Sequence, residues 1–386
     1  MVAADGARAV RPARRRRVAG VRVLVVNAGS SSLKLTLLDE RDATIAEREL
    51  AAPGAQVDPG ELRDALAEGL RDADAVGHRI VHGGELFRGP VVLDADVEEQ
   101  LRGLVDLAPL HQPKSLAALD AIGEALGGKP AVACFDTAFH ATLPEAAATY
   151  ALPAEWRERW ALRRYGFHGL SHGWVARRAP ELLGSGAAEL RIVSCHLGAG
   201  ASLCAIAGGR SVDTTMGFTP LEGLVMATRS GTVDPGMLLW LLEHEPISAR
   251  ELAETLEHRS GLLGLAGSAD MAEVVRHALD GEPAGELALD VYVHRLRGAI
   301  AAMAAAMGGL DALVFTGGVG ERSAEVRARA AAGLGFLGIE VDPAVNAEAS
   351  PDGEIGPPDA AVRTLLIAAR EDLEIARQTR ATLTSG

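Results

Sequence analysis

The feature that most constrains the fold of this chain is a strand, a glycine turn and a second strand near the N-terminus. Residues 21–26 (VRVLVV) and residues 33–38 (LKLTLL) predict two strands joined by residues 27–32 (NAGSSS). Because side chains alternate between the two faces of a strand, the leucines of the second strand share one face, and Ser32 and Lys34 lie on the other. The segment therefore predicts a hairpin whose turn carries hydroxyl groups and free backbone N–H groups.

The same arrangement is repeated about half a chain later. Residues 191–195 (RIVSC) predict a strand, residues 196–202 (HLGAGAS) a glycine turn, and residues 203–207 (LCAIA) a returning strand. A unit that recurs at this distance indicates two similar domains that face each other. Chance is the alternative, because glycine turns between strands are common. A length of 386 residues also favours two domains, since single cores stop growing at about 250–300 residues.

Further strands and helices alternate along the rest of the chain. A third glycine turn, residues 317–321 (GGVGE), is expected after a strand at 311–316. Ser323 is expected to cap the helix that follows, because a serine hydroxyl accepts a hydrogen bond from a free N–H of the first turn. Near the C-terminus, a strand at 364–368 leads into a helix around residues 372–381. This alternation predicts an α/β fold in which helices pack on mixed sheets.

Charge and composition exclude several classes of protein. The net charge of −14 argues against a duplex-DNA binder, since phosphate contacts need clustered Lys and Arg. No apolar run reaches the roughly 18 residues that a membrane span needs. Cys134, Cys195 and Cys204 form no CxxC pair, which predicts buried free thiols in a reducing cytosol. Residues 1–20 are rich in arginine and lack the apolar core of a secretory signal, which predicts a disordered basic arm.

The glycine turns suggest phosphate binding, because such turns present backbone N–H groups to phosphate oxygens. The chain contains no GxxxxGK[ST] loop, and no GxGxxG pattern follows its first strand. The turns therefore match neither a P-loop nor a dinucleotide fingerprint.

Two arginines stand in unusual surroundings. Arg79 lies in residues 77–85 (GHRIVHGGE), and Arg229 lies in residues 226–236 (MATRSGTVDPG). An arginine among glycines and apolar residues is poorly explained as a surface charge, and its guanidinium can bind a carboxylate or phosphate through two parallel bonds. Both are candidate anion clamps, with a structural ion pair as the alternative.

An acid and a histidine are further candidates. Asp136 follows the strand-like run AVACF, and an acid at the carboxyl end of a sheet strand is well placed to face a cleft; local turn bonding is the alternative. His168 can donate a hydrogen bond to a transferring phosphoryl group, with a buried structural histidine as the alternative. The i,i+4 pairs His78/His82 and His168/His172 do not predict zinc, because the Glu of HExxH is missing and glycines flank both pairs.

Together these segments resemble the acetate kinase family, within the superfamily of acetate and sugar kinases, heat-shock proteins and actin. The resemblance runs from about Val21 to Arg377. Single motifs are weak, but this many in this order are specific. They are VNAGSSSLK (26–34), HRIVHGGE (78–85), APLHQP (108–113), FDTAFH (135–140), YGFHGLSH (165–172), HLGAGAS (196–202), MGFTPLEGL (216–224), TRSG (228–231), GLLGLAGSADM (261–271) and FTGGVGE (315–321).

The resemblance implies two duplicated ribonuclease H-like domains of the actin-like ATPase type, with mixed sheets flanked by helices and the active site in the cleft between them. Residues 21–138 plus 372–386 would form the N-terminal domain, with the first phosphate turn and the carboxylate site. Residues 139–371 would form the C-terminal domain, with the second phosphate turn, the adenosine site and the dimer contacts. A cytoplasmic homodimer is implied, with ATP or ADP as co-substrate, Mg²⁺ or Mn²⁺ as the metal, and no nucleic-acid or membrane partner.

The resemblance also implies roles for residues at matching positions. Four would be catalytic: Asp136, Arg79, Arg229 and His168. Arg79 would also bind the substrate, together with a small apolar pocket made by Val81, Leu110, Phe167 and Pro220. Asn27 and Glu371 would place the metal ion. The nucleotide and its phosphates would contact Ser30, Ser32, Lys34, His196, Leu197, Gly198, Ala199, Gly200, Asp270, Met271, Ala272, Gly318, Val319, Gly320, Glu321 and Arg322.

Four positions depart from the family pattern. Ala199, Arg322 and Arg370 stand where Asn is usual, and Ala272 stands where Arg is usual. Ala199, Arg322 and Ala272 fall on the nucleotide side, while the carboxylate pocket is intact. We therefore expect an ordinary acyl substrate and altered handling of the phosphoryl donor. Arg322 would stack on the adenine or reach a phosphate, and GTP or pyrophosphate is the alternative donor.

The expected activity is reversible transfer of a phosphoryl group from ATP to acetate, giving acetyl phosphate and ADP by a direct in-line step. A carboxylate is already ionised at pH 7, so the site needs alignment and positive charge rather than a strong base. The nearest alternative is a kinase for propionate or butyrate. Two others are a non-catalytic nucleotide-binding relative, which would not need both arginines and Asp136, and a sugar kinase, which would need a larger and more polar pocket.

Overall fold

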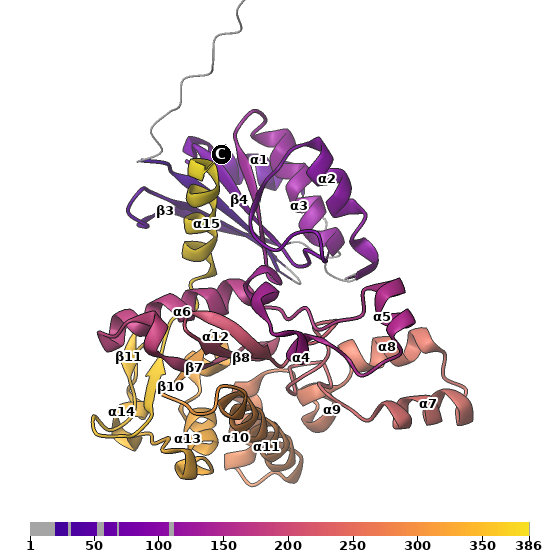
Figure 1. Ribbon diagram of the computed structural model, residues 1–386, viewed down its shortest axis with the longest axis vertical. Coiled ribbons are helices and arrows are strands. Elements are labelled where there is room, and N and C mark those ends of the chain that lie inside the picture. The colour runs from indigo at the N-terminus through magenta and orange to yellow at the C-terminus, as the bar shows by residue number, and fades with distance from the viewer. Residues whose placement is uncertain (1–19, 30–31, 52–57, 68, 108–111, 386) are drawn as a thin grey trace, which may run out of the picture.

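The chain folds around two six-stranded sheets, one above the other in Figure 1. The structure, a computed structural model, describes residues 20–29, 32–51, 58–67, 69–107 and 112–385. The arm expected at residues 1–20 lies outside the described residues, apart from Gly20.

The first sheet has the strand order β3-β2-β1-β4-β6-β5. Strands β1, β4 and β6 run parallel, whereas β2, β3 and β5 run antiparallel to their neighbours. The bounds are β1 (Val23–Ala28), β2 (Ser32–Leu38), β3 (Thr44–Ala51), β4 (Ala75–Ile80), β5 (Val91–Val92) and β6 (Ala131–Phe135).

The second sheet repeats this topology strand for strand. Its order is β9-β8-β7-β10-β12-β11, and β7, β10 and β12 run parallel while the other three are antiparallel. The bounds are β7 (Arg191–Leu197), β8 (Ala201–Ala207), β9 (Arg210–Thr214), β10 (Ala312–Thr316), β11 (Gly353–Glu354) and β12 (Arg363–Leu366). The duplication predicted from the two hairpins is thereby confirmed.

The two hairpins match in pairing but differ by one residue in the turn. Asn27 pairs with Lys34 across the first hairpin, and His196 pairs with Ser202 across the second. Strand β1 starts two residues later than predicted and extends to Ala28, into the predicted turn. The leucines of β2 are buried as the alternation predicted.

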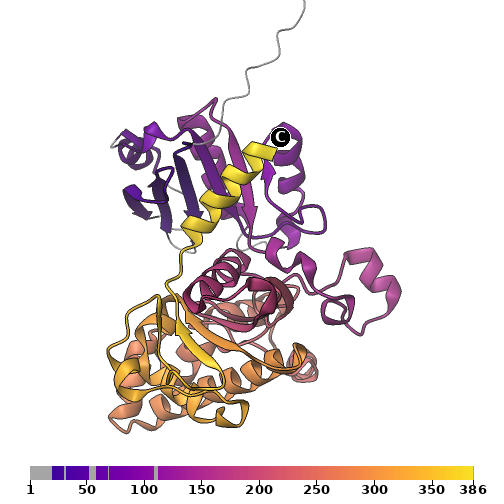
Figure 2. The ribbon, with the colours of Figure 1, turned by 60° about the vertical axis from the view of Figure 1, so that its left-hand side comes forward.

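Helices cover both faces of the first sheet. On one face, Leu24 and Leu35 pack against α1 (Pro59–Ala67) and α3 (Gln112–Ala125). On the other face, Val23 and Val25 pack against α15 (Glu371–Ser385). Strand β12 belongs to the second sheet, so the chain crosses between the sheets just before Glu371, and Figure 2 shows α15 lying across the first sheet after this crossing.

The second sheet is also covered on both faces. Helix α6 (Gly169–Leu183) packs on one face, and α10 (Met271–Leu279), α11 (Pro283–Ala306) and α13 (Ala324–Ala332) pack on the other. The remaining α-helices are α2 (Ala95–Arg102), α4 (Glu145–Ala148), α5 (Ala154–Trp160), α7 (Pro235–His244), α8 (Ala249–His258), α9 (Gly261–Ala266), α12 (Gly317–Arg322) and α14 (Pro343–Ala347). Short 3₁₀ helices span Leu70–Asp72, Val105–Leu107, Ala138–Thr142, Ala187–Glu189 and Gly335–Leu337.

The third glycine segment is a helix, so the prediction of a turn there is wrong. Residues Gly317–Arg322 form α12 directly after β10. Gly317 has φ 78°, and a Cβ there would lie 2.8 Å from the carbonyl oxygen of Leu197, so glycine lets the chain enter the helix against β7. The predicted cap is confirmed, because the Ser323 hydroxyl accepts a hydrogen bond from Val326 N at the start of α13.

Cys134, Cys195 and Cys204 are buried and free, as predicted. Among the described residues, no helix combines the length and the apolar character needed to span a bilayer.

Candidate active site

The candidate residues converge because the carboxyl ends of the parallel strands in the two sheets face one another. In the first sheet, Asn27 lies near the end of β1, Arg79 near the end of β4, and Asp136 directly after β6. His196 lies near the end of β7, and Glu371 is the first residue of α15 after β12. Loops and helix ends at such strand ends form the usual ligand sites of α/β folds.

Arg79 is the centre of this constellation. Its Nε and Nη2 atoms donate to both oxygens of Asp136, with Nη2 2.7 Å from Oδ2, and Nη1 donates to Asn27 Oδ1 at 3.0 Å. Each Nη atom keeps one further N–H for an anion, since a guanidinium carries five. Burial raises the pKa of Asp136, and the charge and hydrogen bonds of Arg79 oppose that rise.

Glu371 extends this network toward the second sheet. The Asn27 side-chain amide donates to Glu371 Oε2 at 3.1 Å, and Arg79 Nη1 lies 4.0 Å from the same oxygen. Burial raises the pKa of Glu371, but the charge of Arg79 and the amide of Asn27 outweigh it, so the pKa is lowered overall. Glu371 is therefore a carboxylate held between two partners.

His168 occupies a constrained position at the start of α6. Its backbone has φ 56°, a left-handed conformation that is uncommon outside glycine and often marks functional sites. Its Nδ1 atom is 2.9 Å from Ser202 Oγ, and its ring stacks on His196 with centroids 4.4 Å apart. Burial, followed by the charges of its neighbours, lowers the pKa of His168 well below the usual range, so the ring is neutral at pH 7.

One cavity of about 180 Å³ brings most of the candidate catalytic and substrate residues together. It is lined by Ala28, Gly29, Arg79, Val81, Lys114, Asp136, Phe167, His168, Gly200, Pro220 and Arg229. Leu110, the remaining residue of the expected apolar pocket, lies outside the described residues. We refer to this space as the carboxylate cavity.

Arg229 enters the carboxylate cavity from the second half of the chain. Its Nε atom forms an ion pair with Glu257 Oε2 at 3.0 Å, and its Nη1 atom donates to the Pro220 carbonyl at 3.4 Å. The sequence gives no signal for Glu257, since a glutamate in the amphipathic helix α8 looks like a surface residue. The Glu257 residue is 8 % exposed, so its carboxylate is a buried support for Arg229.

A second cavity of about 330 Å³, the phosphate cavity, adjoins the first through Arg79, His168 and Gly200. Lys34 also lines it, and its Nζ atom pairs with Glu47 at 3.1 Å on the half-exposed edge of the sheet. The Ser32 hydroxyl donates to Glu49 at 2.7 Å and does not line the cavity as described. Ser30 lies outside the described residues.

A third cavity of about 760 Å³, the nucleotide cavity, joins the phosphate cavity through Gly198, Ala199 and Gly318. Of the expected nucleotide residues, it is also lined by Asp270, Met271, Ala272, Val319 and Arg322. Tyr292, which sequence analysis missed, lines it as well, and its buried hydroxyl has no hydrogen-bond partner among the described residues.

Three further expected nucleotide residues lie beside these cavities rather than in their walls, as far as the described residues define them. Leu197 is fully buried in the core of the second sheet, and Gly320 packs over Phe315. Glu321 Oε1 accepts hydrogen bonds from Gly317 N and Ala369 N, so this side chain joins the start of α12 to the segment before Glu371.

The four departures from the family pattern are all placed. Ala199 and Ala272 lie in the wall of the nucleotide cavity, and Arg322 lies there with its Nε donating to the Gly318 carbonyl at 3.1 Å. Arg370 forms a two-pronged ion pair with Asp372, with Nη2 2.8 Å from Oδ2.

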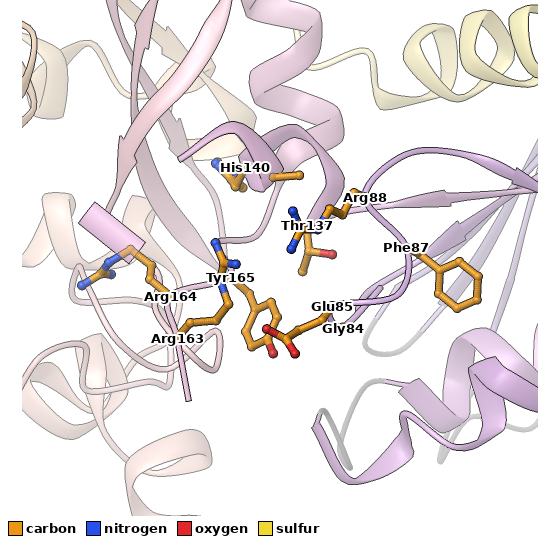
Figure 3. Close-up of a pocket in the computed structure, with 10 residues that line it drawn as sticks. Gly84, Glu85, Phe87, Arg88, Thr137, His140, Arg163, Arg164 and Tyr165 are labelled. Atoms are coloured by element: carbon orange, nitrogen blue, oxygen red, sulfur yellow. The ribbon is translucent and has the colours of Figure 1, made fainter. Parts of the chain in front are cut away.

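A further cavity lies between residues 84–88 and residues 163–165, and Figure 3 shows its lining. Its volume of about 20 Å³ corresponds to roughly one water molecule. His140 already bonds to Ser211 and to the Phe167 carbonyl, and Arg164 bonds to Glu222. This space is too small for it to be the reaction site.

The described residues contain no group of three or more His, Cys, Asp or Glu side chains that could hold a metal ion by themselves. Asn27 and Glu371 do face the phosphate cavity together. An ion there would need oxygens from a ligand or from water to complete its shell, which is the usual situation for Mg²⁺ beside phosphates.

Comparisons with known proteins identify relatives of this chain. The acetate kinase of Nostoc punctiforme is 44 % identical over 398 residues, which cover 92 % of this chain and 98 % of that protein. The crystal structure of Porphyromonas gingivalis acetate kinase superimposes with a TM-score of 0.86 at 36 % identity, covering 94 % of this chain and 100 % of that one. A propionate kinase from Francisella tularensis gives a TM-score of 0.86 at 33 % identity, covering 93 % and 98 %. A sequence model of the family described as the Acetokinase family matches residues 60–377, and this chain belongs to that family.

Proposed function

We propose that this chain transfers a phosphoryl group between ATP and acetate, giving acetyl phosphate and ADP in the forward direction and the reverse under suitable conditions. The observation that carries this proposal is the lining of the carboxylate cavity. Arg79, Arg229 and His168 supply donors and positive charge on one side, and Val81, Phe167 and Pro220 supply a small apolar wall on the other. A short carboxylate has this combination of an anionic end and an apolar end.

The connection between cavities supports direct transfer. The carboxylate cavity opens on the phosphate cavity at Arg79, His168 and Gly200, and the phosphate cavity opens on the nucleotide cavity. An acetate oxygen in the first cavity and a nucleotide in the third would place the transferring phosphoryl group beside Arg79 and His168. The phosphoryl group then moves in line from one oxygen to the other with no covalent enzyme intermediate.

The residues of the site would stabilise the charge that crowds at the transfer point. The acetate carboxylate attacks as an anion, so Asp136 need not remove a proton, and its two oxygens hold Arg79 in place instead. The free N–H groups of Arg79, the guanidinium of Arg229 and the N–H of His168 would donate to the phosphoryl oxygens and the carboxylate. Charge complementarity of this kind contributes most where water is excluded.

We propose Mg²⁺ as the metal that accompanies the nucleotide, with Mn²⁺ as a substitute. The Glu371 carboxylate borders the phosphate cavity, and Asn27 holds it in place, which fits an ion that takes one carboxylate together with phosphate oxygens and water. When bound, the ion would neutralise phosphate charge.

Two narrower assignments remain within this proposal. The carboxylate cavity also suits propionate or butyrate, because one methylene changes preference by only about 1–3 kcal/mol, and a propionate kinase shares the fold. On the nucleotide side, Arg322 stands in the cavity wall where the family has Asn, which favours a role in donor binding for this arginine.

We propose a division into residues 21–138 plus 372–386 and residues 139–371, which follows the two sheets and the return of α15 to the first. We also propose a homodimer formed through α7. No residue of α7, all of which the structure describes, is buried, and the exposed side chains include Met237, Leu239, Trp240 and Leu242. A monomer rarely exposes such a patch. A cytoplasmic location is consistent with three buried free thiols.

The test is the initial rate of acyl phosphate formation, trapped as the hydroxamate. Acetate, propionate and butyrate would each be combined with ATP, GTP and pyrophosphate, with Mg²⁺ and with EDTA. We expect turnover of acetate or propionate with ATP that EDTA abolishes and that added Mg²⁺ restores. No turnover with any pair, from folded protein, would overturn the proposal and favour a binding-only relative.

A further inference from the structure

Behind His168 lies an unbroken chain of buried hydrogen bonds that the reaction scheme above does not use. His168 Nδ1 is 2.9 Å from Ser202 Oγ, and the same oxygen is 2.9 Å from His172 Nε2. His172 Nδ1 is in turn 2.9 Å from Ser194 Oγ. Ser194, Ser202 and His172 have no exposed surface. We call these four residues the Ser–His chain.

The Ser–His chain is assembled from three elements around the second hairpin. His168 and His172 are one turn apart at the start of α6, Ser194 lies on β7, and Ser202 lies on β8. Side chains four apart on a helix lie on the same face, so both rings point at the hairpin. The register of the hairpin pairs Ser202 with His196, whose ring stacks on that of His168.

The protons of this chain are coupled. A serine hydroxyl carries one proton, so Ser202 can donate to one of its two histidines and must accept from the other. Both rings are neutral, because burial lowers the pKa of His168 and of His172 well below the usual range. A neutral imidazole has one N–H and one bare nitrogen. Because an unpaired buried hydroxyl proton is costly, Ser202 donates to the ring that does not donate to it, and the tautomer of His172 determines the tautomer of His168.

Ser194 sets the donor-to-acceptor direction of the hydrogen bonds along the Ser–His chain. In one direction, Ser194 donates to His172 Nδ1, His172 Nε2–H donates to Ser202, and Ser202 donates to His168 Nδ1. In the other, His172 donates to Ser194, and the Ser194 hydroxyl proton has nowhere to go, because His172 is its one hydrogen-bond partner among the described residues. A buried donor left unpaired costs about 1–3 kcal/mol, which favours the first direction.

We propose that Ser194, His172 and Ser202 are positioning residues that fix His168 as the Nε2–H tautomer and so hold a neutral N–H donor toward the transferring phosphoryl group. The Nε2 atom faces Gly200, where a Cβ would lie 3.3 Å from it, and Gly200 lines both the carboxylate and the phosphate cavities. The opposite tautomer would present a lone pair to phosphoryl oxygens and repel them. This inference rests on the proposed role of His168.

The same argument applies to the tautomer of the neighbouring histidine, His196. His196 Nδ1 is 2.8 Å from the Ser171 hydroxyl, and that hydroxyl has no second hydrogen-bond partner within the described part of the chain. If Ser171 donates, His196 also carries its proton on Nε2, on the ring edge that faces Gly198, where a Cβ would lie 3.8 Å from Nε2. Two stacked imidazoles would then both present N–H groups to the phosphate cavity.

The tautomer can be measured without turnover. Protein labelled with ¹⁵N-histidine would be examined by long-range ¹H–¹⁵N correlation at pH 7.5, with His168→Asn and His172→Asn used to assign the two rings. We expect His168 and His172 each to show a protonated Nε2 and a bare, hydrogen-bonded Nδ1, and the His168 pattern to change to mixed tautomers in Ser202→Ala. An Nδ1–H tautomer at His168 in the unsubstituted protein would overturn the proposal.

Kinetics test the consequence. Ser202→Ala should lower kcat about 10- to 100-fold, with KM for acetate and ATP changed less than about twofold. This is less than the roughly 10²–10³-fold cost of removing an aligned transition-state donor, because the His168 ring remains and only its tautomer is released. Ser194→Ala should lower kcat in the same way but less, and Ser202→Thr, which keeps the hydroxyl, should restore most of it. The matched control is Ser211→Ala, which removes a buried hydroxyl 2.8 Å from His140 Nδ1, outside the cavity, and should leave kcat within about twofold.

The two measurements separate the possible failures. An unchanged kcat in Ser202→Ala, or an equal loss in Ser211→Ala, would show that the serines act only on stability and would overturn the positioning role. If the unsubstituted protein makes no acyl phosphate, the proposed function fails, yet the NMR pattern still decides whether the chain sets the tautomer.

Discussion

Arg79 and Asp136 form a buried, two-pronged ion pair in which both carboxylate oxygens are occupied. Nε lies 3.2 Å from Oδ1 and 3.1 Å from Oδ2, and Nη2 lies 2.7 Å from Oδ2. The Asp136 side chain is 2 % exposed. A carboxylate held in this way is poorly placed to accept a proton from a substrate. Its role in the proposed reaction is to orient Arg79, which suits an acceptor that arrives already ionised.

Replacing Arg79 with lysine should therefore abolish most activity although the charge is kept. A single ammonium cannot reproduce the bonds to Asp136 and Asn27 and still offer donors to an anion. We expect kcat/KM for acetate to fall roughly 10³-fold, the lower range for loss of an arginine in phosphoryl transfer. Initial rates with acetate measure this. The control is Arg102→Lys, whose arginine pairs with Asp120 at the surface, and equal losses in the two variants would contradict the assignment.

Glu257 should matter although it lines none of the carboxylate, phosphate and nucleotide cavities. Glu257→Gln keeps the size of the side chain but removes the charge that holds Arg229 Nε at 3.0 Å. A less ordered Arg229 should raise KM for acetate about tenfold, with a smaller change in kcat, since one charged contact accounts for roughly 1.5–3 kcal/mol. Glu254→Gln, an exposed glutamate on the same helix, is the matched control. Identical acetate saturation curves for both variants would show that Glu257 does not support the site.

Replacing Arg322 tests whether this arginine takes part in binding the phosphoryl donor. The guanidinium lies in the nucleotide cavity wall and bonds to the Gly318 carbonyl. If it contacts the nucleotide, Arg322→Ala should raise KM for ATP roughly tenfold, the loss of about one charge-assisted hydrogen bond, and leave KM for acetate unchanged. Arg276→Ala, at an exposed ion pair on α10, should change neither constant. An ATP dependence that Arg322→Ala leaves untouched would remove the support for an altered donor site.

Acid should destabilise the protein through its buried histidines. Burial lowers the pKa of His78, His82 and His140 to about 4, against an ordinary value of 6.5. The unfolded chain therefore binds more protons than the folded one between pH 6.5 and about 4, and stability is complete above this window and lost as pH falls through it. Each group can remove up to ~1.4 kcal/mol per pH unit. The raised pKa values of Asp136 and Asp213 act in the opposite direction, but the buried histidines outnumber them.

Urea unfolding at pH 7.5, 7.0, 6.0 and 5.0, at constant ionic strength, measures this effect. We expect the unfolding midpoint to change little from pH 7.5 to 7 and to fall steeply from 6.0 to 5.0. Midpoints that stay level down to pH 5.0 would mean that these histidines are protonated in the folded state.

The parts of the fold that could be predicted are those that depend on local pattern. The alternating leucines of β2 and the matching glycine turns were enough to predict the duplicated hairpins, since burial with period 2 is visible in sequence. The helix at Gly317 was not predictable, because its left-handed entry depends on the carbonyl of Leu197 from another strand.

The residues that hold the site residues in place could not be predicted from the sequence, for a related reason. Arg79 and Arg229 stand out in sequence because charges among glycines are unusual. Glu257 does not stand out, because its position in α8 resembles a solvent-facing one and its burial depends on where Arg229 folds back. The link between Ser202 and His172 depends on the register of β7 with β8 and on the docking of α6, neither of which a motif records.

Leu239→Asp, at an exposed leucine of α7, should convert the proposed dimer into a monomer. Leu239 is 61 % exposed and Trp240 is 51 % exposed, on a helix none of whose described residues is buried. A second copy of the chain would cover these side chains with its own α7 in a symmetric dimer, which is the commonest arrangement of homo-oligomers. A carboxylate at the centre of that contact would be buried without a partner, at a cost of several kcal/mol for each copy. Light scattering coupled to gel filtration measures the mass directly. Leu279→Asp, at a leucine that is 63 % exposed at the end of α10, controls for added surface charge and should leave the mass at that of a dimer. A Leu239→Asp variant that also runs as a dimer would assign the contact to another surface, and a monomeric unsubstituted chain would leave α7 without the partner proposed for it.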